Sequence, residues 1–576
     1  METVKNRAWR IRDESSAADD VDALAATLEV SPLLARLLDM RGIKNTAAAD
    51  TFLNGKLTAL PDPSRLHGMG IAVQRLVVAV QQKEKILIHG DYDVDGISAT
   101  ALLVEFFNSV GAEVGYHVPL RLKDGYGLSA QALDRAAAQR VKVVVSVDCG
   151  VTAVEEADLA SDYGIDLIIT DHHQPPEDLP QALAIINPHQ DNCCFEDKNL
   201  AGVGVAFFLA IGLRKGLRDA DFFNGDRPEP DLRHLLDLVA LGTIADVVPL
   251  IGVNRLLTSS GLKVLNTGSR AGIRALLRVA AVKNADSGSV GFKLAPRLNA
   301  AGRIEDAALG VRLLLSDDET EVDEIAGLLD GFNRERQNIE ARTMRQAEKA
   351  VAELDPERRT IVLADPGWHS GVIGIVASRL VERYYRPTFL LAIENSQAKG
   401  SGRSTRDIHL YDALQGCSDC LNGFGGHAAA AGLSIDVDAI ETFTAAFENA
   451  VARQQTEPGV SFIEYDGEVF LADLTVGSVS EFARLAPFGM GNPSPQFVVR
   501  NVNILGLKTV GEKHLKFSAR QDAYSVQCIA FGMAEREDEL EGSIDLLFVP
   551  ELNEWKGRTE VQLRVRDWRQ TVVSEE

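Results

Sequence analysis

Acidic residues and histidines recur directly after short apolar runs in this chain. Five segments share this pattern: residues 89–96, 146–150, 171–173, 187–189 and 242–246. Carboxylate oxygens and imidazole nitrogens are suitable ligands for divalent cations such as Mn²⁺ and Mg²⁺. Two such ions about 4 Å apart can hold both sides of an in-line phosphoryl displacement. These residue types therefore predict a hydrolase that uses two metal ions.

Three of these segments follow β-branched stretches that are typical of buried strands. The stretches are residues 85–88, 141–147 and 166–170. In an open parallel α/β sheet, ligands bind at the carboxyl ends of the strands. We therefore expect the acids and histidines to converge at one edge of such a sheet.

The first segment places His89, Asp93 and Asp95 within one turn after a strand. Gly96 would let the backbone turn away sharply, so that the three side chains converge. We expect Asp91 to support the ligands from behind. A solvated Asp-Gly turn is the alternative interpretation.

Asp148 and Asp246 both lie in apolar surroundings. A carboxylate there is costly unless it is paired or coordinated, although either residue could also cap a helix. His172 and His173 follow Asp171 directly after an apolar run. Tandem imidazoles at a strand end favour a functional role over packing.

Size and composition fit a large multidomain protein. The chain has 576 residues, of which 45% are hydrophobic and 25% are charged, so we expect several domains with substantial cores. Six cysteines at this length do not suggest a disulfide framework. We expect a cytoplasmic protein, because no secretory signal and no membrane-spanning apolar run is visible. The net charge of −24 argues against a generally basic surface, but local basic segments such as residues 399–406 remain compatible with nucleic-acid binding.

Periodicity predicts an α/β protein with a parallel sheet, followed by a smaller α/β region and a β-rich end. The expected division is a helical lead-in at 1–80, a catalytic domain at 81–315, a long connecting helix at 316–355, a second α/β domain at 356–454 and an OB-type β-barrel at 455–576.

Glycine-rich segments mark the second α/β domain. Residues 399–404 and 423–432 are predicted to be loops, and Gly425-Gly426-His427 is predicted to open an Ala-rich helix. Helix N-termini bind phosphate, so a phosphate-binding role is expected for His427. Tight packing of the glycines is the alternative.

The motifs, in this order, resemble those of the DHH phosphoesterase family. The matching residues are Asp91-x-Asp93-x-Asp95-Gly96, Asp148-x-Gly150, Asp171-His172-His173, Asp246 and, in the second lobe, Gly425-Gly426-His427. Within that family the chain is most similar to single-stranded-DNA-specific 5′-to-3′ exonucleases. The resemblance covers essentially the whole chain, including the C-terminal barrel.

The resemblance implies a ligand set for two Mn²⁺ or Mg²⁺ ions. One ion would take His89, Asp93 and a bridging Asp148. The second would take Asp95, Asp148, His172 and Asp246. His173 would then bind the scissile phosphate, and Asp171 would support the site from behind.

The resemblance also implies a grip on the 5′-terminal phosphate. The candidate side chains are Arg121, Arg297, Arg303, Ser401, Arg403 and His427. A surface ion pair is the alternative role for any one of these arginines. In the barrel, the side chains that could contact a single strand are Lys508, Lys513, His514, Lys516, Phe517 and Trp555, although Phe517 could equally belong to the core.

Further implications concern partners and rival functions. Family resemblance implies single-stranded DNA as substrate, a single-strand-binding protein and a DNA helicase as partners, and a role in recombination and repair; we expect a monomer. The rivals are a manganese pyrophosphatase, a hydrolase of nano-RNA or phosphoadenosine phosphate, and a non-enzymatic replication scaffold. The expected third domain disfavours the two enzymes, and the complete ligand set disfavours the scaffold.

Overall fold

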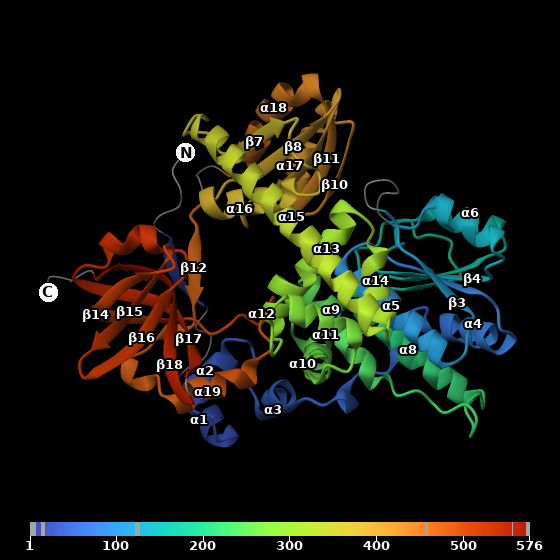
Figure 1. Cartoon of the computed structure of the whole chain (residues 1–576), viewed down its shortest axis with the longest axis horizontal. Helices are drawn as coiled ribbons and strands as arrows, with labels where there is room; N and C mark the ends of the chain where they lie inside the picture. Colours follow the sequence, from blue (N-terminus) through green and yellow to red (C-terminus); the bar gives the residue numbers. More distant parts are fainter. Residues whose placement is uncertain (1–6, 13–17, 121–126, 456–458, 556, 572–576) are drawn as a thin grey trace. The chain divides into compact units, whose positions relative to one another are not determined.

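The computed structural model describes residues 7–12, 18–120, 127–455, 459–555 and 557–571 (Figure 1).

The chain forms two compact units. The first contains Met1–Trp9, Ala300–Asp306 and Gly327–Ile463, and the second contains Arg10–Asn299, Ala307–Ala326 and Glu464–Glu576. Among the described residues, no helix has both the length and the apolarity needed to cross a bilayer.

A parallel five-stranded sheet lies at the centre of the DHH-like part of the second unit. Its strands, in spatial order, are β3 (Val114–His117), β2 (Ile86–His89), β4 (Val143–Val147), β5 (Asp166–Thr170) and β6 (Ala184–Ile186). The crossover helices are α5 (Val94–Ser109), α6 (Ala130–Ala138) and α7 (Val154–Asp162). Every residue of β4 is buried, as expected for a central parallel strand. The predicted parallel α/β sheet is therefore confirmed.

Helices cover this sheet and continue beyond it. They are α4 (Met69–Gln82), α8 (Gly202–Asp219), α9 (Leu236–Ala245), α10 (Gly252–Thr267), α11 (Ala271–Val279), α13 (Ala295–Ile304) and α14 (Ala308–Leu315). Helix α9 is buried along its whole length up to Ile244. A short helix, α12 (Ser287–Ser289), leads into a π-helical turn at Val290–Leu294.

The long helix predicted from the sequence is present as α15 (Glu319–Ala352). It leads into a sheet in the first unit with the order β10-β11-β9-β8-β7. The strands are β7 (Ile361–Asp365), β8 (Thr388–Glu394), β9 (Gln397–Arg403), β10 (Gly423–Gly426) and β11 (Ala430–Asp436). The helices are α16 (Ile373–Tyr384), α17 (Leu410–Gln415) and α18 (Ile440–Gln454).

Three predictions for this region are wrong. Most of the supposed Gly-rich loop at 399–404 is strand β9. Most of the supposed loop at 423–432 belongs to strands β10 and β11. The supposed Ala-rich helix after His427 is strand β11. The glycines of β9 have a packing role, because a Cβ on Gly402 would lie 2.3 Å from Cζ of Phe389. Close packing, rather than loop formation, explains these glycines.

The C-terminal region of the second unit is a closed β-barrel, as predicted. Its strands are β14 (Phe497–Val510), β15 (His514–Gln521), β16 (Tyr524–Ala530), β17 (Ser543–Trp555) and β18 (Arg558–Gln570). Pairing between β14 and β17 closes the barrel. Phe517 is 1% exposed and belongs to the barrel core, so it is not a base-stacking side chain.

The N-terminal helices pack against this barrel. They are α1 (Ala18–Leu28), α2 (Pro32–Asp39) and α3 (Thr46–Asn54). Leu34 and Leu37 share one apolar core with Phe497 and Phe517. Helix α19 (Val476–Phe482) contributes Phe482 to the same core. The remaining strands are β1 (Ala8–Ile11), β12 (Phe462–Tyr465) and β13 (Gly467–Glu468).

Candidate metal centre and phosphate site

The carboxyl ends of strands β2, β4 and β5 place three predicted segments at one edge of the sheet. His89 is the last residue of β2 and pairs in register with Ser146 of β4. Asp148 and Asp171 follow directly after the paired residues Val147 and Thr170. Parallel pairing therefore brings these segments together, as predicted.

The N-terminus of α5 positions Asp93 and Asp95. Asp93 is the N-cap residue, and its Oδ1 accepts hydrogen bonds from the backbone N–H groups of Asp95 and Gly96 at 2.9 and 3.1 Å. Gly96 lies inside the first helical turn and does not form the sharp exit that we predicted. It is required for close approach, because a Cβ there would lie 2.7 Å from Cβ of Asp91.

Helix α8 holds the carboxylate of Asp95 from the other side. The backbone N–H groups of Gly202 and Val203 donate to Asp95 at 2.7 and 2.9 Å. A helix N-terminus stabilises negative charge, so this contact favours an ionised Asp95. The contact fixes the side chain in the buried cluster.

Three sets of side chains bring their potential ligand atoms within 4.8 Å of one another. The sets are Asp91, Asp93 and Asp148; Asp95, His172 and Asp246; and Asp148, His172 and His173. Asp148 and His172 each belong to two sets. The structure thus gathers all but one of the predicted ligands.

His89 is the exception, because it belongs to none of these sets among the described residues. It is fully buried, and its Nε2 lies 3.1 Å from the carbonyl oxygen of Gly127. Its role as a ligand stays a prediction. Asp91, predicted to support the ligands from behind, instead has an oxygen within one of the sets.

The imidazole of His172 lies among three carboxylates. Its Nε2 is 3.1 Å from Oδ1 of Asp148, 3.5 Å from Oδ2 of Asp246 and 3.9 Å from Oδ2 of Asp95. Burial and the nearby His173 lower the pKa of His172 to about 4, so the ring is neutral at pH 7. A neutral imidazole nitrogen facing carboxylate oxygens is a suitable environment for a cation.

The carboxylates repel one another. Burial and Asp93 raise the pKa of Asp95 to about 7, and burial with Asp95 and Asp93 raises the pKa of Asp246 to about 9. Burial and the same neighbours also raise the pKa of Asp148 well above its usual value. The buried Nε2 of His172 has no hydrogen-bond partner among the described residues. Hard oxygen and nitrogen ligands with excess negative charge fit divalent cations.

Asp171 orients the tandem histidines. Its Oδ1 accepts the backbone N–H of His172 at 2.7 Å and lies 2.7 Å from Nδ1 of His173, while its Oδ2 accepts the N–H of Val151 at 2.9 Å. Burial disfavours charge on His173, but the hydrogen bond to Asp171 outweighs it and raises the pKa of His173 to about 9. Asn187 adds a bond from Nδ2 to the carbonyl oxygen of His173 at 2.8 Å. His173 is therefore a cation at neutral pH.

The first unit contains a separate polar cluster around the start of α16. Nη1 of Arg403 donates to Oγ of Ser401 at 3.2 Å, and a Cβ on Gly374 would lie 2.7 Å from that Oγ. Nη1 of Arg303 donates to the carbonyl oxygen of Gly371 at 2.7 Å. Three residues that we predicted to bind the 5′-terminal phosphate, Ser401, Arg403 and Arg303, thus lie near the first turn of α16 or the residues just before it.

Sequence reasoning missed His369 in this cluster. Its Nδ1 accepts the N–H of Gly371 at 3.1 Å, and its carbonyl oxygen accepts the N–H of Val372 at 2.9 Å. A histidine in a Gly-containing turn before a helix was the available signal.

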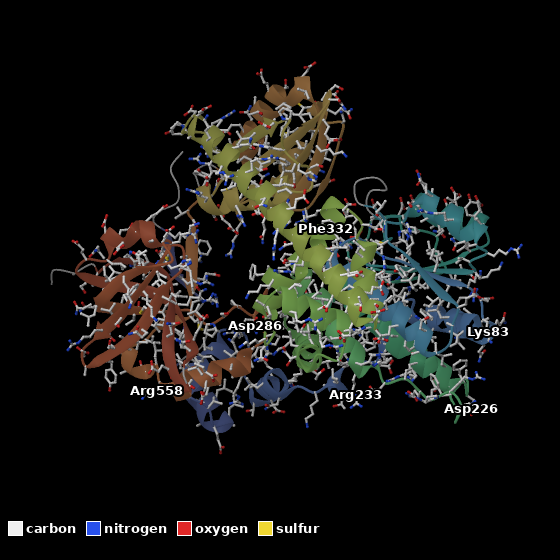
Figure 2. All side chains as sticks on the ribbon, viewed as in Figure 1. Lys83, Asp226, Arg233, Asp286, Phe332 and Arg558 are labelled. Carbon is white, nitrogen blue, oxygen red and sulfur yellow. The ribbon has the colours of Figure 1, made fainter. Side chains whose placement is uncertain are left out.

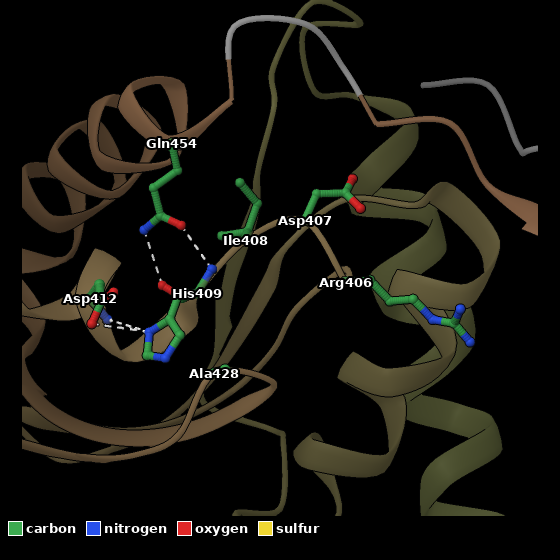
Figure 3. A pocket seen from close by; sticks show the side chains of 7 residues that line it. All are labelled: Arg406, Asp407, Ile408, His409, Asp412, Ala428 and Gln454. Carbon is green, nitrogen blue, oxygen red and sulfur yellow. Dashed lines mark hydrogen bonds and ion pairs between the residues drawn. The ribbon is translucent and has the colours of Figure 1, made fainter. Parts of the chain in front are cut away.

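His427 lies in the turn between β10 and β11, and the next residue, Ala428, lines a cavity of about 440 Å³. Figure 3 shows His409 between Asp412 and Gln454, with Arg406 pointing away. The backbone N–H of His409 donates to Oε1 of Gln454 at 2.8 Å. Burial, Arg403 and His409 lower the pKa of His427.

Arg297 and Arg121 are the two remaining residues that we predicted to contact the phosphate. Arg297 lies on α13 in the second unit, where its Nη1 donates to the carbonyl oxygen of Lys293 at 2.6 Å. Arg121 lies outside the described residues.

Comparison with known proteins agrees with this arrangement. Family models match the DHH family, N-terminal domain, at residues 85–243, the DHHA1 domain at 357–453 and the RecJ OB domain at 465–567. The chain is 38% identical over 568 residues to the single-stranded-DNA-specific exonuclease RecJ of Bacillus subtilis, covering 97% of this chain and 70% of that protein. The chain belongs to the RecJ family. Escherichia coli RecJ is 38% identical over 556 residues, covering 93% of this chain and 95% of that protein.

Solved RecJ structures share the fold. RecJ of Thermus thermophilus in complex with Mn²⁺ matches with a TM-score of 0.84 at 32% identity, covering 98% of this chain and 80% of that chain. The same protein with Mg²⁺ matches with a TM-score of 0.79 at 30% identity, covering 98% and 79%. RecJ of Thermus thermophilus thus binds both cations, and in this chain the cluster around Asp148 and His172 has suitable ligands for either.

Proposed function

We propose that this RecJ-family enzyme is a single-stranded-DNA-specific 5′-to-3′ exonuclease that releases 5′-mononucleotides. The observation that carries the proposal is the convergence of Asp148, His172 and Asp246 in a chain whose relatives in Bacillus subtilis and Escherichia coli are single-stranded-DNA-specific exonucleases. The match of the barrel to the RecJ OB domain supports this function over the pyrophosphatase and nano-RNA alternatives.

The cations would be held by His89, Asp93, Asp95, Asp148, His172 and Asp246. When bound, they neutralise charge on the phosphodiester and lower the pKa of the attacking water. Asp148 is suited to bridging because it belongs to two ligand sets. His172 is neutral and can offer a lone pair.

His173 would contact the scissile phosphate directly. Its raised pKa keeps the ring protonated at neutral pH, and Asp171 fixes its orientation. A positioned cation that faces a phosphate stabilises the additional charge that develops during the displacement. Hydrolysis would release the terminal nucleotide and leave a new 5′-phosphate for the next cycle.

The 5′-terminal phosphate would be held by Ser401 and Arg403, with Arg303, His427, Arg297 and Arg121 as further contacts. Guanidinium groups bind phosphate through charge-assisted hydrogen bonds. Backbone N–H groups at the start of α16 could add to this grip. Recognition of the end would make the enzyme an exonuclease with 5′ polarity.

End-labelled single-stranded DNA with Mn²⁺ or Mg²⁺ tests the function. A 5′ label should appear at once in mononucleotide, whereas a 3′ label should pass through a ladder of shortened strands. Asp148→Ala should abolish both patterns, and Asp158→Ala, an exposed acid on α7, should not. Activity confined to pyrophosphate or dinucleotides, or an active Asp148→Ala enzyme, would refute the proposal.

The end grip has its own test. Ser401→Ala and Arg403→Gln should raise KM for 5′-phosphorylated DNA more than for 5′-hydroxyl DNA. Lys399→Gln on the same strand, an exposed residue, is the matched control. Equal effects on both substrates would show that these residues do not read the phosphate.

The cellular setting is part of the same proposal. We place the enzyme in the cytoplasm as a monomer that acts in recombination and repair, with a helicase supplying the single strand and a single-strand-binding protein as partner. We retain the predicted five-part division as a proposal for its domain limits. Sedimentation of the purified chain with and without DNA would test the monomer.

A further inference from the structure

A groove of about 730 Å³ separates the barrel from the helical part of the same unit. We call it the seam groove; its lining includes Phe292, Phe488, Pro493, Glu551, Arg564 and Arg566. One wall is the α12 and π-helical segment, and the other consists of β17 and β18 with the Pro-rich residues before β14. Figure 2 marks Asp286, which begins the first wall, and Arg558 on β18. The volume lies within the ~300–1,000 Å³ that is typical of ligand sites.

Phe292 gives this groove an unusual surface. The side chain is 86% exposed although it is a large aromatic group. It projects from the π-helical turn at Val290–Leu294, a backbone form that is rare and frequent at functional sites. Exposure of a lone aromatic ring suits stacking against a planar ligand.

The basic side chains of the opposite wall differ in their pairing. Nε of Arg564 lies 2.6 Å from Oε1 of Glu551. Arg566, by contrast, forms no hydrogen bond and no ion pair with any described residue. Burial and Arg564 lower the pKa of the Arg566 guanidinium, although Glu551 acts in the opposite direction. A phosphate in the groove would give this guanidinium a charge-assisted hydrogen-bond partner.

The seam groove is connected to the metal centre through α9. Asp246 is the C-cap residue of α9, and a Cβ on Gly291 would lie 3.7 Å from Cγ2 of Ile244. The π-helical turn that carries Phe292 therefore packs on the end of the helix that presents Asp246. Oγ of Ser287 also donates to the carbonyl oxygen of Phe488 at 2.5 Å, which joins the two walls.

We propose that the seam groove holds the single strand on the 3′ side of the cleaved bond, with a base stacked on Phe292 and a phosphate bound by Arg566. This inference rests on the proposed exonuclease function. It places the strand on β17 and β18 rather than on the outer face of β15 and β16, where OB folds commonly bind nucleic acid. In β15, Phe517 is buried and offers no stacking surface there.

Fluorescence anisotropy of a labelled single-stranded oligonucleotide tests the groove without hydrolysis if Ca²⁺ replaces Mn²⁺. Phe292→Ala should weaken binding about tenfold, since stacking of one base has that effect. Arg566→Gln should reduce the slope of log K against log salt by about 0.7, because one phosphate contact is lost. Tyr524→Ala on β16 and Arg558→Gln at the other end of β18 are exposed, matched controls that should bind like the wild type.

The outcomes separate this inference from the exonuclease proposal. If the wild type degrades DNA but both groove variants bind as tightly as the wild type, the groove inference is overturned and the exonuclease proposal stands. That is also the result expected if the groove binds a protein instead. Loss of DNA binding in Tyr524→Ala without loss in Phe292→Ala would overturn the groove inference and would place the strand on the β15–β16 face. Weak binding of both groove variants supports the groove even if no hydrolysis is detected.

Discussion

The backbone of Gly242 packs directly against the carboxylate of Asp95. A Cβ atom on Gly242 would lie 2.6 Å from Oδ1 of Asp95 and 2.8 Å from Cγ1 of Val203. Helix α9 can approach α5 and α8 this closely only because residue 242 has no side chain. The distance between the acids at the ends of these helices depends on that contact.

Gly242→Ala should therefore weaken metal binding as well as stability. We expect a loss of about 1–3 kcal/mol in the free energy of unfolding, the usual effect of overpacking. Gly327→Ala in α15 is the matched control, because a Cβ there meets nothing within 4 Å. That control should gain about 0.5–1 kcal/mol through helix propensity. Denaturant unfolding and Mn²⁺ titration of both variants check the expectation, and wild-type Mn²⁺ affinity in Gly242→Ala would contradict it.

Asp148→Asn should separate stability from function. In EDTA the variant should unfold at a higher temperature than the wild type, because one of several buried carboxylates that repel each other is gone; the gain should be about 1–3 kcal/mol. Saturating Mn²⁺, at 100 times Kd, should stabilise the wild type by about 2.7 kcal/mol for each ion bound and the variant by less. Thermal unfolding with and without Mn²⁺ measures both effects. Equal Mn²⁺ shifts in the two proteins would exclude Asp148 as a ligand.

Asp171→Asn should lower the pKa of His173 from about 9 towards its ordinary value, because the carboxylate that holds the charged ring is lost. Activity should fall about 10- to 100-fold, as it does for other residues that orient a metal site. NMR titration of the histidine ring gives the pKa, and the pH profile of kcat/KM gives its consequence. An unchanged His173 titration would show that Asp171 acts only on the backbone.

His234 should make stability depend on pH. Nε2 of His234 lies 3.0 Å from Oε1 of Glu105, and this bond raises the pKa of His234 although nearby Arg270 opposes it. Its stabilising effect should be complete below about pH 6.5 and should disappear as the pH rises through the folded-state pKa. Since the side chain is half exposed, the effect should be at most about 1 kcal/mol. Urea unfolding of wild type and His234→Gln should differ at pH 5.5 and converge at pH 9; a constant difference would argue against the pair.

The sequence was most informative where local pattern and topology agree. The apolar run that becomes β4 and the acid that follows it could be recognised because a central parallel strand is buried throughout. Strands β4 and β5 are parallel neighbours, so the residues that follow them, Asp148 and the segment of His172, lie next to each other. The long helix α15 was equally visible because its residues contain few helix breakers.

The errors arose where tertiary packing decides. Strand β9 is rich in glycine, which has low β-propensity, yet Gly400 and Gly402 permit contact with Leu391 and Phe389. The seam groove could not be predicted, because its walls come from segments about residues 286–292 and 479–566. No local sequence pattern shows that two segments so far apart in the chain form one groove. The exposed Phe292 alone would be read as an ordinary core residue.

The closure of the barrel by β14 and β17 has a consequence for solubility during folding and turnover. A sheet that closes on itself presents no row of unpaired backbone groups to another chain. Strand exchange between molecules would first require the paired strands β14 and β17 to separate. The apolar core that includes Phe497, Phe517 and Phe548 opposes that separation. The barrel should therefore resist aggregation through strand exchange when the protein is concentrated.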